Sequence, residues 1–93
     1  MNYWWLSFAD PYAEGDKFVG ACVVAADSFE KAVKESILQG CNAGPHTEVQ
    51  AMKVRKEHEH ELLSKHPINK FLSRKELNDK GRFTDYERRH SHH

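Results

Sequence analysis

The pattern of apolar and polar positions predicts two strands near the start of the chain. Tyr3–Phe8 is short and rich in aromatic side chains, which is typical of a strand. Alternation divides its side chains between two faces, with Trp4, Leu6 and Phe8 on one and Tyr3, Trp5 and Ser7 on the other. The run from Lys17 to Ala25 is apolar on both faces, as in a strand inside a sheet. Asp10-Pro11 and Gly15-Asp16 supply turn signals between the two, so we expect a β-hairpin.

The apolar period then changes from two to between three and four. Spacings of this kind join four residues and predict a helix that packs on the sheet: Phe29, Ala32, Val33 and Ile37. Asp27 or Ser28 would cap its first turn, and Gly40 would end it. Thr47 to Val54 predicts a third strand. Because it follows a helix, it can lie parallel to one of the first two strands.

Charge dominates the chain after the third strand. Arg55 to Lys65 predicts an exposed helix anchored by Leu62 and Leu63, and Ser73 with Glu76 forms a capping-box pattern for a short helix. Apolar residues between the two helices would tether this part to the body: Ile68, Phe71 and Leu72. We therefore predict one α+β domain over residues 1–81, with a β-β-α-β core (1–54) and a charged helical C-terminal extension (55–81). Residues 82–93 would form a flexible, basic and histidine-rich tail.

Length and charge restrict the function classes. Fourteen basic and fourteen acidic residues among 93 argue against general nucleic-acid binding. No apolar run is long enough to span a bilayer, and no signal-peptide pattern is present, so we expect a cytoplasmic protein without a membrane partner. A chain this short encloses a deep pocket only at high cost, so a ligand site would be a surface groove or lie between subunits. We accordingly expect a homo-oligomer.

Two stretches carry a resemblance to a known family. Trp5-Leu6-Ser7-Phe8-Ala9-Asp10, followed by Phe18-Val19-Gly20-Ala21-Cys22-Val23-Val24, resembles a family of small uncharacterised proteins from bacteriophages and bacteria. Gly40-Cys41-Asn42-Ala43-Gly44 is similar to that family's glycine-rich loop, although relatives tend to have Pro-Gly-Gly-Glu after the asparagine. The resemblance implies a fold and a phage origin, hence the host cytoplasm, but no activity.

The loop from Cys41 to Glu48 is the candidate binding site. Loops with glycine and asparagine can leave backbone amides unshielded, and such concavities hold phosphate or carboxylate. The predicted ligand-binding residues combine loop polar groups with two aromatic side chains: Asn42, Gly44, His46, Glu48, Trp5 and Tyr12. We expect a non-enzymatic protein that binds a small phosphorylated or nucleotide-like ligand without a cofactor. The alternative is that Gly40 merely ends a helix and the loop is a turn.

Two other functions remain open at this stage. A protein-interaction module would bind a host protein through the charged tail or an exposed strand edge. A small hydrolase would use Cys41 as nucleophile, His46 as base and Glu48 to orient the histidine. The face of the first strand that carries Trp5 is either an exposed aromatic patch or is covered by residues 68–77.

The histidines of the charged segment do not predict a metal site. Glu57-His58-Glu59-His60-Glu61 has an alternating pattern, and residues two apart lie about 200° apart around a helix. His58 and His60 therefore cannot chelate one ion together, and a solvated charged helix accounts for the segment.

Overall fold

The computed structural model describes the backbone of residues 1–80 and the side chains of residues 1–78. The predicted tail, residues 82–93, lies outside the described residues. The chain forms four strands and three helices in the order β1 (Asn2–Ala9), β2 (Phe18–Ala26), α1 (Phe29–Leu38), β3 (Glu48–Lys53), α2 (Lys56–Lys65), β4 (Leu72–Ser73) and α3 (Arg74–Lys80). This order confirms the α+β class, the β-β-α-β core and the helical extension.

The four strands form one antiparallel sheet in the order β3-β1-β2-β4. The β1–β2 hairpin is as predicted, with Trp4 opposite Val24 and Leu6 opposite Cys22. β3 does not pair with a parallel neighbour. It lies antiparallel beside β1, with Leu6 opposite Ala51, and therefore runs in the direction of β2 one strand away.

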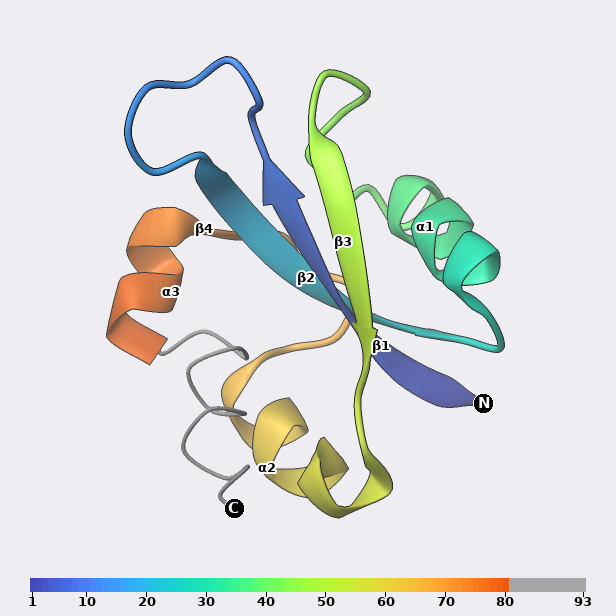
Figure 1. The fold of residues 1–93 in the computed structure, drawn as a ribbon. Helices are drawn as coiled ribbons and strands as arrows, with labels where there is room; N and C mark the ends of the chain where they lie inside the picture. Colours follow the sequence, from blue (N-terminus) through green and yellow to red (C-terminus); the bar gives the residue numbers. More distant parts are fainter. Residues whose placement is uncertain (81–93) are drawn as a thin grey trace, which may run out of the picture.

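The sheet separates two apolar cores, with α1 on one side and α2 and α3 on the other (Figure 1). The α1 core contains two residues of the first alternating set of β1 together with two cysteines, two further β2 residues and one alanine of α1: Leu6, Phe8, Cys22, Val24, Ala26, Ala32 and Cys41. The other core gathers the second set of β1 under the C-terminal helices: Trp5, Ala21, Val23, Val54, Leu62, Leu72 and Leu77. Residues 55–80 are thus a structural layer that covers one face of the sheet and contributes Leu62, Leu72 and Leu77 to its core.

Gly20 shows why the C-terminal segment can lie flat on β2. A Cβ at this position would overlap the Phe71 ring and the Leu72 carbonyl oxygen, so only glycine admits this close approach. Phe71 in turn packs on Phe8, with ring centroids 6.2 Å apart. The tether predicted around Ile68 is confirmed by its bridge to Val23.

The helix termini follow their sequence signals closely. Ser28 is the N-cap of α1, and its side chain accepts a bond from the Lys31 amide at 3.3 Å. At α3, Ser73 and Glu76 form the predicted reciprocal capping box, with amide-to-side-chain distances of 3.1 and 3.3 Å. Both contacts satisfy amides that have no partner inside their helices.

The buried face of α1 differs from the predicted stripe. Ala32 and Ser36 are fully buried against the sheet, whereas Phe29 is 44% exposed and Ile37 62% exposed. The Ser36 hydroxyl donates to the Val33 carbonyl at 2.6 Å, so a polar residue can occupy the packing face without an unpaired donor. Small residues therefore face the sheet, and the larger apolar side chains lie toward the helix flanks.

Candidate functional site

The candidate loop begins with a well-defined helix end. Gly40 adopts φ +71°, the left-handed conformation predicted for the residue that ends α1. The Gly40 amide donates to the Ile37 carbonyl at 3.1 Å, and the Cys41 amide donates to Ser36 at 2.9 Å. This pair of bonds is a Schellman motif, and it turns the chain so that Cys41 points into the core.

Asn42 then fixes the course of the loop. Its Nδ2 donates to the Ser36 hydroxyl at 2.9 Å, and its Oδ1 accepts from the Gly44 amide at 2.8 Å. The Thr47 hydroxyl donates to the Gly44 carbonyl at 2.7 Å, and the Thr47 amide bonds to the same oxygen at 3.1 Å. Because the Asn42 side chain donates one bond and accepts another within the protein, its main role is to hold the loop, in agreement with the turn interpretation.

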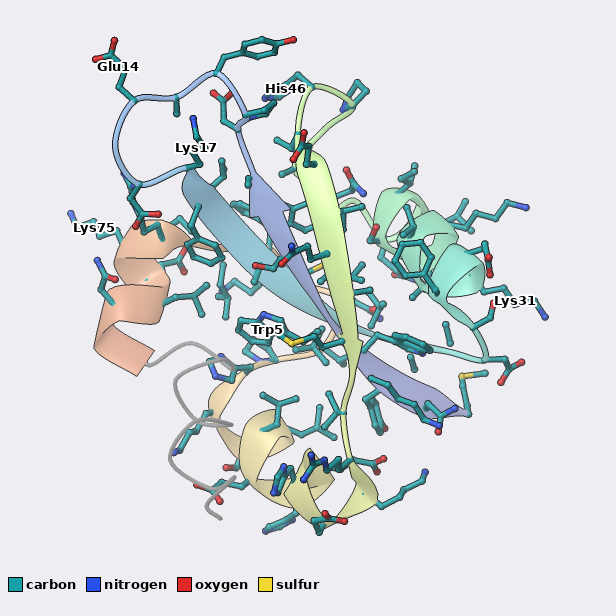
Figure 2. The ribbon with its side chains drawn as sticks, viewed as in Figure 1. Trp5, Glu14, Lys17, Lys31, His46 and Lys75 are labelled. Atoms are coloured by element: carbon teal, nitrogen blue, oxygen red, sulfur yellow. The ribbon has the colours of Figure 1, made fainter. Side chains whose placement is uncertain are left out.

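His46 and Glu48 are the exposed polar groups of the loop. The His46 ring lies against Gly44, with two ring atoms 3.1 and 3.2 Å from where a Cβ would be. Gly44 has φ +116°, which also favours glycine there. Figure 2 shows His46 at the top of the loop that leads into β3, where its imidazole faces solvent. It is therefore available to a ligand.

A groove of about 390 Å³ lies between α1 and this loop. Its walls come from α1, the loop and two strands: Phe8, Val33, Ile37, Gly40, Asn42, Gly44, Pro45, Thr47 and Val49. Five of these nine are apolar side chains, none is charged, and the polar groups belong to the loop side. The groove suits the apolar body of a ligand more than an isolated phosphate.

Sequence reasoning found the loop wall of the groove but missed the helix and strand walls. Val33 and Ile37 were assigned to the helix face that packs on the sheet. Val49 was assigned to a strand, with no role in a ligand site. The exposed position of Ile37 follows from the rotation of α1 about its axis. That rotation depends on how Ala32 and Ser36 fit the sheet, which periodicity does not encode.

The two predicted aromatic residues do not join the loop. Trp5 is 1% exposed and belongs to the core on the α2 side of the sheet, where its ring meets His66 edge-on with centroids 5.3 Å apart (Figure 2). The covered interpretation of this face is therefore confirmed, and Trp5 cannot reach a ligand beside α1. Tyr12 is 90% exposed in the β1–β2 loop and does not line the groove.

Cys41 lacks the environment of a nucleophile. It is 1% exposed, and its burial raises the pKa of the thiol above its usual range. The neighbouring Cys22 thiol is equally buried, and its pKa is raised by burial and by Cys41. A catalytic cysteine needs a lowered pKa and access to substrate, so the structure offers no support for a hydrolase built on Cys41 and His46.

The charged helix forms two ion pairs whose lysines are exposed, although the Glu59 side chain is only 19% exposed. Lys56 lies 3.3 Å from Glu59 and Lys65 lies 3.3 Å from Glu61 on α2. Among the described side chains, no group of three or more His, Cys, Asp or Glu residues could hold a metal ion. None of the helices in residues 1–80 is long and apolar enough to cross a membrane.

Comparison with known proteins gives no relative: no protein-family model, no curated protein and no solved structure matches this chain. The resemblance to small phage and bacterial proteins therefore stays a prediction.

Proposed function

We propose that this chain is a non-enzymatic binding protein whose groove between α1 and residues 40–49 holds a small ligand. The observation that supports this most is the groove itself, an open apolar site with polar groups along one rim. Val33, Ile37 and Val49 would contact a hydrocarbon or aromatic body. His46 would face a polar or anionic group at the loop end.

The chemistry of the ligand differs from a simple phosphate. The amides of Gly40, Cys41, Gly44 and Thr47 already bond within the protein, so few remain for an anion. A nucleotide-like molecule would be held mainly through its flat base in the groove, with its phosphate beside His46. More generally, we expect an amphipathic ligand with an apolar body and one anionic group.

Binding of anilinonaphthalene sulfonate, an aromatic dye with one sulfonate, tests this function. We expect saturable fluorescence enhancement and amide NMR shifts confined to α1 and residues 40–49. Ile37→Glu should weaken binding about tenfold, because a carboxylate on the groove wall disfavours both an apolar ring and a sulfonate. Adenosine monophosphate and decanoate as competitors would show whether a base or a hydrocarbon chain is preferred.

Leu38→Glu is the matched control for this test. Leu38 is the next residue of α1, is 79% exposed and does not line the groove. The same charge placed there should leave dye affinity unchanged. Equal loss in both variants, or NMR shifts spread over the α2 side, would contradict a specific site in the groove.

The open edge of β3 favours a second function, a protein-interaction module. β3 is an end strand of the sheet and borders the groove through Val49. Exposed strand edges bind other chains by adding a strand.

A further inference from the structure

The outer side of β3 is an open strand edge. β3 ends the sheet on one side, whereas the outer side of β2 is occupied by β4 and by a bridge from Ile68 to Val23. Figure 1 views the sheet from the β3 side, and no labelled element lies in front of this strand. Within residues 1–80, β3 is thus the one edge of several residues that no other strand pairs.

The hydrogen bonds to β1 determine which backbone groups face outward. The Val54 amide donates to the Tyr3 carbonyl at 2.9 Å, which makes these two residues a hydrogen-bonded antiparallel pair. Bonding direction alternates along an antiparallel strand, so the residues at positions 52, 50 and 48 also turn their backbone groups toward β1. The N–H and C=O groups of Val49, Ala51 and Lys53 therefore point away from the sheet.

The centre of this edge carries none of the usual protection against pairing, since its charged residues, Glu48 and Lys53, lie at the two ends of the strand. Natural edge strands often have a central lysine, a proline or a bulge that blocks a second chain. The four central residues, Val49–Met52, are uncharged and contain no proline, and the register with β1 is regular along the whole strand. The edge is therefore suited to accept another strand.

We propose that the occupant is a second copy of this chain, paired antiparallel through β3 across a two-fold axis at Ala51, and that Lys53 of the second copy completes the groove. The three outward residues are symmetric about Ala51. An axis there pairs Ala51 with itself and Val49 with Lys53 of the second copy, so every outward backbone group of both strands gains a partner. This inference rests on the proposed function, because it names a further residue of the same site.

The alternative axis, at Gln50, satisfies fewer groups. It would pair Val49 with Ala51 of the second copy and leave Lys53 opposite Thr47, which lies before the strand begins. Neither axis brings the two lysines opposite each other, so charge does not distinguish them. The hydrogen bonds favour the axis at Ala51.

The pairing would supply a charge that one chain lacks at its groove. Residues directly opposite in antiparallel strands share a face of the sheet, so Lys53 of the second copy lies on the α1 side beside Val49. Val49 lines the groove, and no lysine or arginine is among the lining residues. The ammonium would thus stand at the groove mouth and bind the carboxylate, sulfonate or phosphate of an amphipathic ligand.

The expected dimer is weak without a ligand. Stable interfaces bury about 1,200–2,000 Å² in total, more than six paired edge residues supply alone. A ligand that contacts both copies binds the dimer more tightly than the monomer and shifts the equilibrium by mass action. Anilinonaphthalene sulfonate should therefore promote association.

Sedimentation velocity of the full chain, with and without anilinonaphthalene sulfonate, tests the association. We expect a monomer–dimer equilibrium that the dye shifts toward dimer. Ala51→Pro should abolish the dimer and weaken dye binding about tenfold; because the Ala51 amide points outward, the bonds between β1 and β3 persist. Lys53→Ala should retain the dimer and weaken dye binding by a similar factor.

Cysteine cross-linking tests the axis and does not depend on how Ala51→Pro folds. Ala51→Cys places two thiols at a directly opposed pair, about 5.5 Å apart between Cα atoms, within reach of a disulfide. Gln50→Cys is the control, because its counterpart in the second copy is displaced along the strand. The native Cys22 and Cys41 are buried and should not contribute.

A disulfide-linked dimer through residue 51, and not through residue 50, supports the proposal. Cross-linking through residue 50 alone would overturn the register, and with it the role of Lys53. A monomer at all concentrations, with rapid hydrogen exchange at Val49 and Ala51, would overturn the dimer and leave the edge to a chain of different sequence. If dye binding still requires Ile37 in such a monomer, the groove function survives; a dimer without dye binding would refute that function instead.

Discussion

The two faces of the sheet are covered to different extents. On one face α2 and α3 cover Trp5, Leu72 and Leu77, all at most 2% exposed. On the other, α1 alone packs over the sheet, and a groove remains between this helix and the loop before β3. Two helices close a face of this sheet, whereas one helix leaves room at its edge for a ligand.

The largest effect is expected on the closed face. Trp5→Ala removes the largest fully buried side chain and its contact with His66, and should cost about 3–5 kcal/mol of unfolding free energy. Phe29→Ala on the open face removes a ring that is 44% exposed, and should cost less than about 1 kcal/mol. Urea unfolding followed by circular dichroism measures both. Similar losses of unfolding free energy would show that the face of the sheet under α1 is covered as completely as the other face.

A substitution in the loop beside the groove should have an intermediate effect on the unfolding free energy. Asn42→Ala removes two hydrogen bonds and should cost about 1–2 kcal/mol, because the Ser36 hydroxyl and the Gly44 amide lose their partner. Gln39→Ala, which breaks only an exposed bond to Glu35, is the control and should be almost neutral. Thermal unfolding compares them. An equal effect would mean that Asn42 does not organise the loop.

The secondary structure followed from local signals, whereas the site did not. The hairpin, the Gly40 helix end and the Ser73–Glu76 capping box each depend on a few neighbouring residues, and each was predicted correctly. The face of Trp5 could not be chosen, because both faces of β1 are aromatic and the covering helices lie more than fifty residues later. The groove depends on the rotation of α1, which the burial of Ser36 sets through tertiary packing.

The buried thiols should make the stability of the α1 core depend on pH. Burial raises the pKa of Cys41 in the folded chain above its unfolded value, so the neutral thiol is the stabilised form. Its contribution is fully present at neutral pH and is lost as the pH rises beyond about 8.5. The stability of the native chain should therefore fall more steeply from pH 8 to pH 10 than that of Cys41→Ala, as urea titrations across this range would reveal.

Thiol labelling checks the same environment independently. Iodoacetamide should modify neither Cys22 nor Cys41 in the folded chain at neutral pH, and should modify both in urea. Rapid native labelling of Cys41 that His46→Ala suppresses would contradict this account and would support the hydrolase hypothesis.

The smallest effect is expected from the charges on α2, although this helix covers the closed face. Lys56 is 71% exposed in its side chain and pairs across one helical turn with Glu59, which is 19% exposed. Because solvent screens the lysine, the pair should be worth at most about 1 kcal/mol. Lys56→Ala should shift the unfolding free energy by less than this, and added salt should reduce the difference further. Leu62→Ala on the same helix is the contrast, since it removes a buried side chain and should cost about 2–5 kcal/mol. A larger loss from Lys56→Ala than from Leu62→Ala would mean that ion pairs, and not buried apolar side chains, hold α2 on the sheet.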